Sequence, residues 1–154
     1  MDVFSLAVIP CPLIEILQLV KFLTNRLKFT VVDDQDSCFH LELNSGISLI
    51  EADIYEWEGK SVIVFAYSMC NPPSVDNDFV DILEKLLIAY PSSIKVNTSG
   101  LKKIDYSIHE SLEILPMLTK HVTPVRDQWR KMYGDKVGPV RVEDSYIFVG
   151  WTNK

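Results

Sequence analysis

Two long stretches of strand-forming residues, joined by Glu58-Gly59, constrain the fold of this chain more than any other part of its sequence. They run over residues 47–57 and 61–69, and a two-residue turn between them predicts a β-hairpin. Such a turn also fixes which residues lie opposite one another: Trp57 and Lys60, Tyr55 and Val62, Asp53 and Val64, and Glu51 and Ala66. One face of the hairpin is then apolar, and the other carries carboxylates.

The second strand of this hairpin is apolar on both faces. At the edge of a sheet it would expose a flat apolar surface, so we expect it inside a larger sheet. The core residues that the register predicts are Ile50, Ala52, Ile54, Ile63, Phe65 and Tyr67. Strands dominate the first half of the chain and helices its middle, which favours an α+β fold. We therefore expect one domain over residues 1–154, with a mixed or antiparallel single-layer sheet around the central hairpin, packed by helices.

The periodicity of apolar residues predicts the remaining elements. Further strands are expected at 3–9, 29–32, 39–43, 94–96 and, as a second hairpin, 140–142 with 146–151. Helices are expected at 12–28, from just beyond 71–74 to 90, at 104–118 and at 122–133. Asp33 to Asp36 should form a turn, and Pro116 should limit the third helix. Asp76, Asn77 and Asp78 should supply the N-cap and the first-turn acidic residues of the second helix.

Length and composition are those of an ordinary folded protein, with 154 residues of which 47% are hydrophobic and 23% charged. The longest apolar runs fall short of the roughly 20 residues that span a bilayer, and Asp2 stands where a secretory signal would be positive. Cys11, Cys38 and Cys70 are odd in number and far apart, which disfavours disulfides or a paired-cysteine zinc site. We therefore expect a cytoplasmic protein with reduced, mostly buried thiols.

The net charge of −6 is unevenly distributed along the chain. Residues 31–60 contain eight acidic residues against Lys60 alone, whereas residues 120–141 carry an excess of basic residues. An acidic region of this kind is typical of proteins that recognise a basic partner, because opposite charge raises the association rate and helps set specificity. The predicted partner-binding residues are Asp33, Asp34, Asp36, Glu51, Asp53, Glu56 and Glu58.

These patterns predict a small acidic interaction protein without catalytic activity, which binds a basic protein partner. An immunity protein that neutralises a basic toxin or nuclease is one example of this class. We expect no cofactor and no metal, and neither nucleic acid nor a membrane as partner, while homo-oligomers are left open.

Two other functions remain open. Glu51 and Asp53 project from the same side of one strand, about 6–7 Å apart by strand geometry. Such a pair could hold a divalent metal or polarise a water in a metal-dependent enzyme, although a solvated sheet face is the simpler interpretation. The third hypothesis is a small-ligand-binding domain, with a pocket between helix and sheet.

Other candidate residues favour structural interpretations. His40, His109 and His121 are scattered, which indicates surface or packing roles. Cys11 lies between a strand and a helix, where a buried structural thiol is favoured over a nucleophile. Segment 126–133 interleaves arginines with aromatic residues, a pattern that could bind nucleic acid. A helix that packs its tryptophan and keeps its arginines in solvent explains that segment better.

Overall fold

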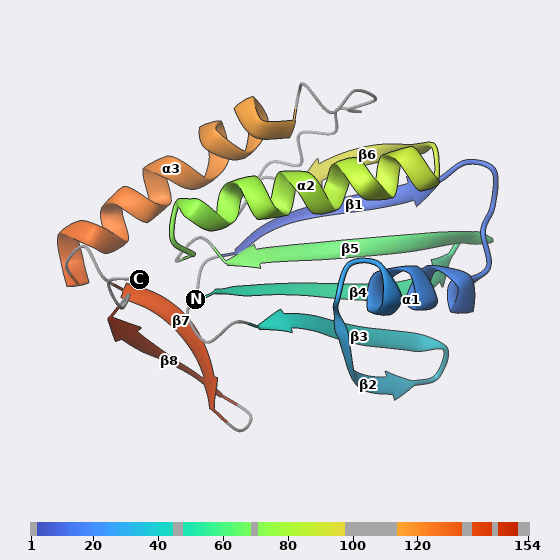
Figure 1. The fold of residues 1–154 in the computed structure, drawn as a ribbon, viewed down its shortest axis with the longest axis horizontal. Coiled ribbons are helices and arrows are strands. Elements are labelled where there is room, and N and C mark those ends of the chain that lie inside the picture. The colour runs from blue at the N-terminus through green and yellow to red at the C-terminus, as the bar shows by residue number, and fades with distance from the viewer. Residues whose placement is uncertain are drawn as a thin grey trace.

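The computed structural model describes residues 3–44, 48–68, 71–97, 114–133, 137–142 and 145–150. In chain order its elements are β1 (Val3–Pro10), α1 (Ile16–Asn25), β2 (Thr30–Gln35), β3 (Cys38–Asn44), β4 (Leu49–Trp57), β5 (Lys60–Ser68), α2 (Ser74–Ala89), β6 (Ser92–Asn97), α3 (Ile114–Tyr133), β7 (Val137–Val142) and β8 (Ser145–Gly150). Six strands form one antiparallel sheet in the order β2-β3-β4-β5-β1-β6, and β7 pairs with β8 (Figure 1). The fold is therefore α+β, as the sequence predicts.

Strands β4 and β5 are joined through Glu58 and Gly59, whose φ angles of 50° and 74° are both positive, as a type I′ turn requires. The observed partners are Trp57↔Lys60, Tyr55↔Val62, Asp53↔Val64 and Glu51↔Ala66, the same pairs that a two-residue turn predicts. In the sheet these strands occupy the third and fourth positions of six. All six residues assigned to the core by this register are no more than 1% exposed.

One face of the sheet forms the core together with α1, α2 and α3. The buried cluster takes its strand residues from this face alone, and it includes Leu19 and Leu23 of α1, Phe79 and Leu83 of α2, and Leu118 and Val122 of α3. The ring of Phe65 lies between those of Phe29 and Phe79, with centroids 6.1 and 5.8 Å away in edge-to-face geometry. We call the opposite side of the sheet the second face.

Helix ends differ from the predictions where prolines and polar residues gave ambiguous signals. α1 begins at Ile16, after Pro12, and Glu15 is its N-cap residue without a side-chain bond. α2 begins at Ser74 after Pro73 as its N-cap residue, so the prediction of an N-cap among residues 76–78 was wrong. The predicted acidic residue in the first turn is present as Asp76. Pro116 lies in the first turn of α3, whereas the sequence predicted that it limits the C-terminal end of a helix. Its missing N–H costs nothing there, because first-turn N–H groups have no partner within a helix.

The predicted turn at Asp33 to Asp36 was also wrong in part. Strand β2 continues to Gln35 past a register shift between Val31 and Asp33, and the turn is made by Asp36 and Ser37, both with positive φ. The predicted second hairpin is present as β7 and β8. Predicted helical residues 104–113 lie outside the described ranges. Among the described helices, none is both long and apolar enough to cross a membrane.

Candidate functional site

Four titratable side chains meet on the second face, where β3 pairs with β4. The register places His40 opposite Asp53 and Glu42 opposite Glu51. Because alternate residues of a strand project to the same side, all four side chains leave the sheet in one direction. We call these four residues the His40 cluster.

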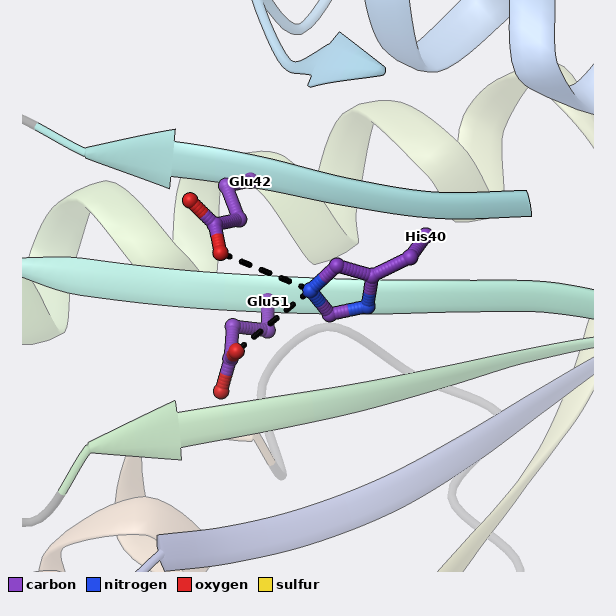
Figure 2. Close-up of side chains that lie close together, drawn as sticks. All are labelled: His40, Glu42 and Glu51. Carbon is purple, nitrogen blue, oxygen red and sulfur yellow. Dashed lines mark ion pairs between the residues drawn. The ribbon is translucent and has the colours of Figure 1, made fainter. Parts of the chain in front are cut away.

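The imidazole of His40 contacts a carboxylate through each ring nitrogen. Nδ1 lies 2.6 Å from Asp53 Oδ1, which is the distance of a strong, charge-assisted hydrogen bond. Nε2 lies 3.4 Å from Glu42 Oε1 and 3.4 Å from Glu51 Oε1. Figure 2 shows this nitrogen turned toward both glutamates at once. One carboxylate therefore holds the ring, and the opposite edge of the ring faces two more.

Exposure differs sharply among the members of the His40 cluster. The side chain of Glu42 is 8% exposed and that of Glu51 18%, whereas those of His40 and Asp53 are 26% and 46% exposed. Like charges directly opposite one another on adjacent strands are destabilising, and their repulsion grows as solvent is excluded. A positive charge placed between Glu42 and Glu51 would therefore stabilise this part of the sheet.

The structure separates the predicted partner-binding residues into two groups. Glu51 and Asp53 belong to the His40 cluster, and Asp33 of β2 lies opposite His40, so these three carboxylates share the second face. Burial and the nearby charges of Asp53 and Asp33 raise the pKa of the Cys38 thiol, which lies on the same face. This environment disfavours a reactive thiolate at Cys38.

The other four predicted residues lie away from the His40 cluster. Asp34 is opposite Phe39, on the helix side of the edge strand, and Glu56 is opposite Ser61. Asp36 and Glu58 occupy the β2–β3 and β4–β5 turns. Since β2 and β4 run in the same direction, both turns lie at one end of the sheet (Figure 1, right). We call the four residues Asp34, Asp36, Glu56 and Glu58 the turn-end group.

Sequence reasoning missed the contacts of His40 and Glu42 with Glu51 and Asp53. Both stand in a segment whose alternation predicts a strand, and that alternation puts them on one face. The missing information was the pairing of this strand with β4, which brings His40 and Glu42 beside Glu51 and Asp53. His40 lies partly exposed on the second face, and its contacts with three carboxylates were not part of the expectation of a surface or packing role.

A second polar cluster is buried between β5, α2 and α3. Arg126 donates from Nη1 to Asp76 Oδ2 at 2.9 Å and from Nη2 to Asp76 Oδ1 at 2.6 Å, and the Tyr67 hydroxyl donates to the same carboxylate. Burial, followed by the hydrogen bond to Asp76, raises the pKa of Tyr67. Arg126 is 3% exposed, so the expectation that it stays in solvent was wrong. This cluster joins three elements through its hydrogen bonds.

The region that precedes α1 contains two hollows. One is lined by residues that include Ile9, Cys11 and Pro91, and the other lies between the start of α1 and the β4–β5 turn. Leu13, at both hollows, is 64% exposed. Cys11 is also exposed, which corrects the expectation of a buried thiol, and Cys70 lies outside the described residues. Glu15, Glu56 and Ser61 are among the residues that line the second hollow.

Comparison of the chain with models of protein families, with curated proteins and with solved structures found no match. The residues described above are therefore the basis for assigning a function.

Proposed function

We propose that this protein binds a basic protein partner through its acidic residues on β2, β4 and the turns that follow them. The observation that carries this proposal is the position of Asp33, Glu51 and Asp53 on one face, with the turn-end group at one end of the same strands. Seven carboxylates then lie on or beside one half of the sheet. Clustered charge of one sign attracts an oppositely charged surface and accelerates its association.

The edge of the sheet supports recognition by charge rather than by strand addition. All six residues of β2 are exposed, and this strand is the first in the sheet order. Asp33 and Asp34 stand in the middle of it, and charged residues on an edge strand oppose pairing with another chain. A partner with lysine and arginine side chains fits this edge better than a partner that supplies a strand.

A nuclease or toxin that acts on nucleic acid is the partner class that this chemistry favours. Such proteins need basic grooves, because phosphate backbones are bound mainly through their negative charge. A carboxylate-rich surface is complementary to a groove of that kind, and by occupying it the protein would neutralise the partner. This supports the function predicted from the sequence, namely an interaction protein of the immunity type.

The test compares two variants that carry the same change in charge. Asp34→Lys with Glu56→Lys alters exposed residues of the turn-end group, whereas Asp78→Lys with Asp81→Lys alters exposed residues of α2. Wild-type protein is immobilised on a support and exposed to a lysate of the cells that make it. It should retain a basic protein from this lysate. The retained protein should associate with the first variant at least about tenfold more slowly than with the wild type. Added salt should also lower its association rate with the wild type.

The α2 variant should associate at the wild-type rate, within about twofold. Association rates are measured by surface plasmon resonance with the retained protein. A retained partner that is acidic, or one that binds both variants equally well, would contradict the proposal.

A further inference from the structure

We propose that His40, Glu42 and Glu51 form a binding site for one divalent transition-metal ion, of which Zn²⁺ is the best fit. The ligand atoms of these three residues all lie within 4.8 Å of one another. The site goes beyond recognition of a basic partner, since its ligand is a metal ion and two of its three residues, His40 and Glu42, are not among the proposed partner-binding residues. The sequence suggested Glu51 and Asp53 as a possible pair of metal ligands. In the proposed site Glu42 replaces Asp53 as the second carboxylate ligand.

The distances around Nε2 of His40 fit metal coordination better than hydrogen bonding. Zn²⁺ binds histidine nitrogen and carboxylate oxygen at about 2.0–2.2 Å, and tetrahedral geometry then separates neighbouring ligand atoms by about 3.3–3.6 Å. Both contacts from Nε2, to Glu42 Oε1 and to Glu51 Oε1, measure 3.4 Å. A direct hydrogen bond from a ring nitrogen to oxygen is shorter, typically about 2.7–3.2 Å.

The types of ligand select among metal ions. Imidazole nitrogen favours zinc and its neighbours in the first transition row, whereas Mg²⁺ and Ca²⁺ are held by oxygen atoms. One histidine with two carboxylates supplies three protein ligands, and a water would complete four-coordination at Zn²⁺. We therefore expect Zn²⁺ to bind more tightly than Mg²⁺ or Ca²⁺.

Burial separates this group from the acidic residues that are common on protein surfaces. Glu42 is 8% exposed and stands directly opposite Glu51 on the neighbouring strand. Two carboxylates so placed repel each other, and a dication between them would remove the repulsion. The turn-end group has neither the burial nor the histidine, so we assign no ion to it.

Asp53 acts on the ion through His40 and is a positioning residue. Its Oδ1 atom is 2.6 Å from Nδ1 of the imidazole. A carboxylate that accepts a hydrogen bond from Nδ1–H keeps the proton on Nδ1, so the lone pair is on Nε2, and it fixes the direction of the ring, as is usual for histidines that bind metals. The lone pair then points to the position between the two glutamates.

The primary experiment is isothermal titration calorimetry of the metal-free full chain with ZnCl₂, followed by absorption spectroscopy with Co²⁺. We expect one ion per chain, and the strong visible bands of tetrahedral Co²⁺ without a thiolate band. Glu42→Gln and Glu51→Gln should each weaken Zn²⁺ binding more than about a hundredfold, and Asp53→Asn about 10- to 100-fold. Asp33→Asn, on the same face, and His121→Gln, on α3, should change it by less than about twofold.

Thermal stability gives a second measurement that does not depend on partner binding. Without metal, Glu42→Gln should unfold at the wild-type temperature or above it, because it removes a repulsive charge. With ZnCl₂ present, the wild type should gain a higher unfolding temperature and Glu42→Gln should gain much less, since a ligand that binds the native state stabilises it.

No saturable heat at millimolar ZnCl₂ would overturn the site. Binding that persists in the Glu42→Gln and Glu51→Gln double variant would place the ion elsewhere and also overturn it. Loss of partner binding in the Asp34→Lys and Glu56→Lys variant, with Zn²⁺ affinity unchanged, would separate the two proposals.

Discussion

Arg126 and Asp76 form a two-pronged ion pair between α3 and the first turn of α2, and their side chains are only 4% and 14% exposed. Arg126→Met would leave the Asp76 carboxylate in this environment without its cation. Loss of one partner from a buried pair costs about 3–5 kcal/mol of unfolding free energy. Urea denaturation of the variant measures this loss. The control is Arg130→Met: Arg130 Nη1 lies 4.0 Å from Asp127 Oδ1, and loss of this more exposed ion pair should cost less than about 1 kcal/mol. A loss as small for Arg126→Met would show that the pair contributes little.

The aromatic contacts of Phe65 make its side chain a sensitive probe of the sheet register. Phe65→Ala removes a ring that packs against Phe29 and Phe79, and we expect a loss of about 3–5 kcal/mol. Val64→Ala changes the neighbouring position on the second face, where the side chain is only half-buried, and should cost about 1 kcal/mol or less. Chemical denaturation measures both variants. Equal losses would contradict the assignment of these two residues to opposite faces.

Asn71 serves as a backbone substitute at the start of β4. Its side-chain oxygen accepts a hydrogen bond from the Leu49 N–H at 2.8 Å, and its amide nitrogen donates to the Leu49 carbonyl at 3.0 Å. Asn71 is fully buried, so Asn71→Ala would leave both Leu49 groups without these bonds. We expect a cost of about 1–3 kcal/mol for each group. Native-state hydrogen exchange at the Leu49 amide measures the effect locally, and unchanged protection there would refute this role.

His121 should make stability depend on pH near neutrality. Burial, with a smaller effect of the Lys120 charge, lowers its pKa, and its ring stacks on Phe4 with centroids 5.4 Å apart. The unfolded chain therefore binds this proton more readily than the folded one. The stabilisation is complete above the unfolded pKa of about 6.5 and is lost as pH falls through the lowered folded value.

The comparison that isolates this effect is wild type against His121→Gln, by urea denaturation from pH 5 to pH 8. The difference in unfolding free energy should change in favour of the wild type as pH rises through this window. A difference that is constant with pH would contradict the prediction.

The thiols should differ in reactivity. Cys11 is exposed, whereas burial and the charges of Asp53 and Asp33 raise the pKa of Cys38. Because the thiolate is the reactive form, a disulfide reagent should label Cys11 at least about tenfold faster than Cys38 in the native protein at pH 7.5. Variants that each retain one of these two cysteines allow the two rates to be measured separately. Asp53→Asn should accelerate labelling of Cys38, and an unchanged rate would contradict the electrostatic cause.

The sequence predicted features that depend on neighbouring residues and missed those that depend on distant ones. The β4–β5 register follows from alternation and from the Glu58-Gly59 turn, so it could be derived locally. The position of β1 between β5 and β6 could not, because long-range strand pairing has no local signal. Proline signals were ambiguous for a similar reason, since Pro116 suits the first turn of a helix as well as the region after its end.

The candidate site illustrates the same limit. Glu51 and Asp53 were identified from one strand, but the contacts of His40 and Glu42 required the pairing of β3 with β4. The burial of Arg126 likewise depends on Asp76, fifty positions earlier in the chain. Residue types and alternation indicated where carboxylates gather. Only the three-dimensional arrangement shows which of them share a histidine.

The place of β1 between β5 and β6 determines when the sheet can be completed during synthesis. Leu6 pairs with Phe65 on one side and with Val96 on the other, so both neighbours of β1 leave the ribosome long after it does. Until then its apolar residues have no permanent partners, a condition that slows folding and favours aggregation or chaperone binding. Among the described strands, β1 is made before its two neighbours and is completed after them, and it joins the hairpin that the chain can form early to the edge strand that is made later.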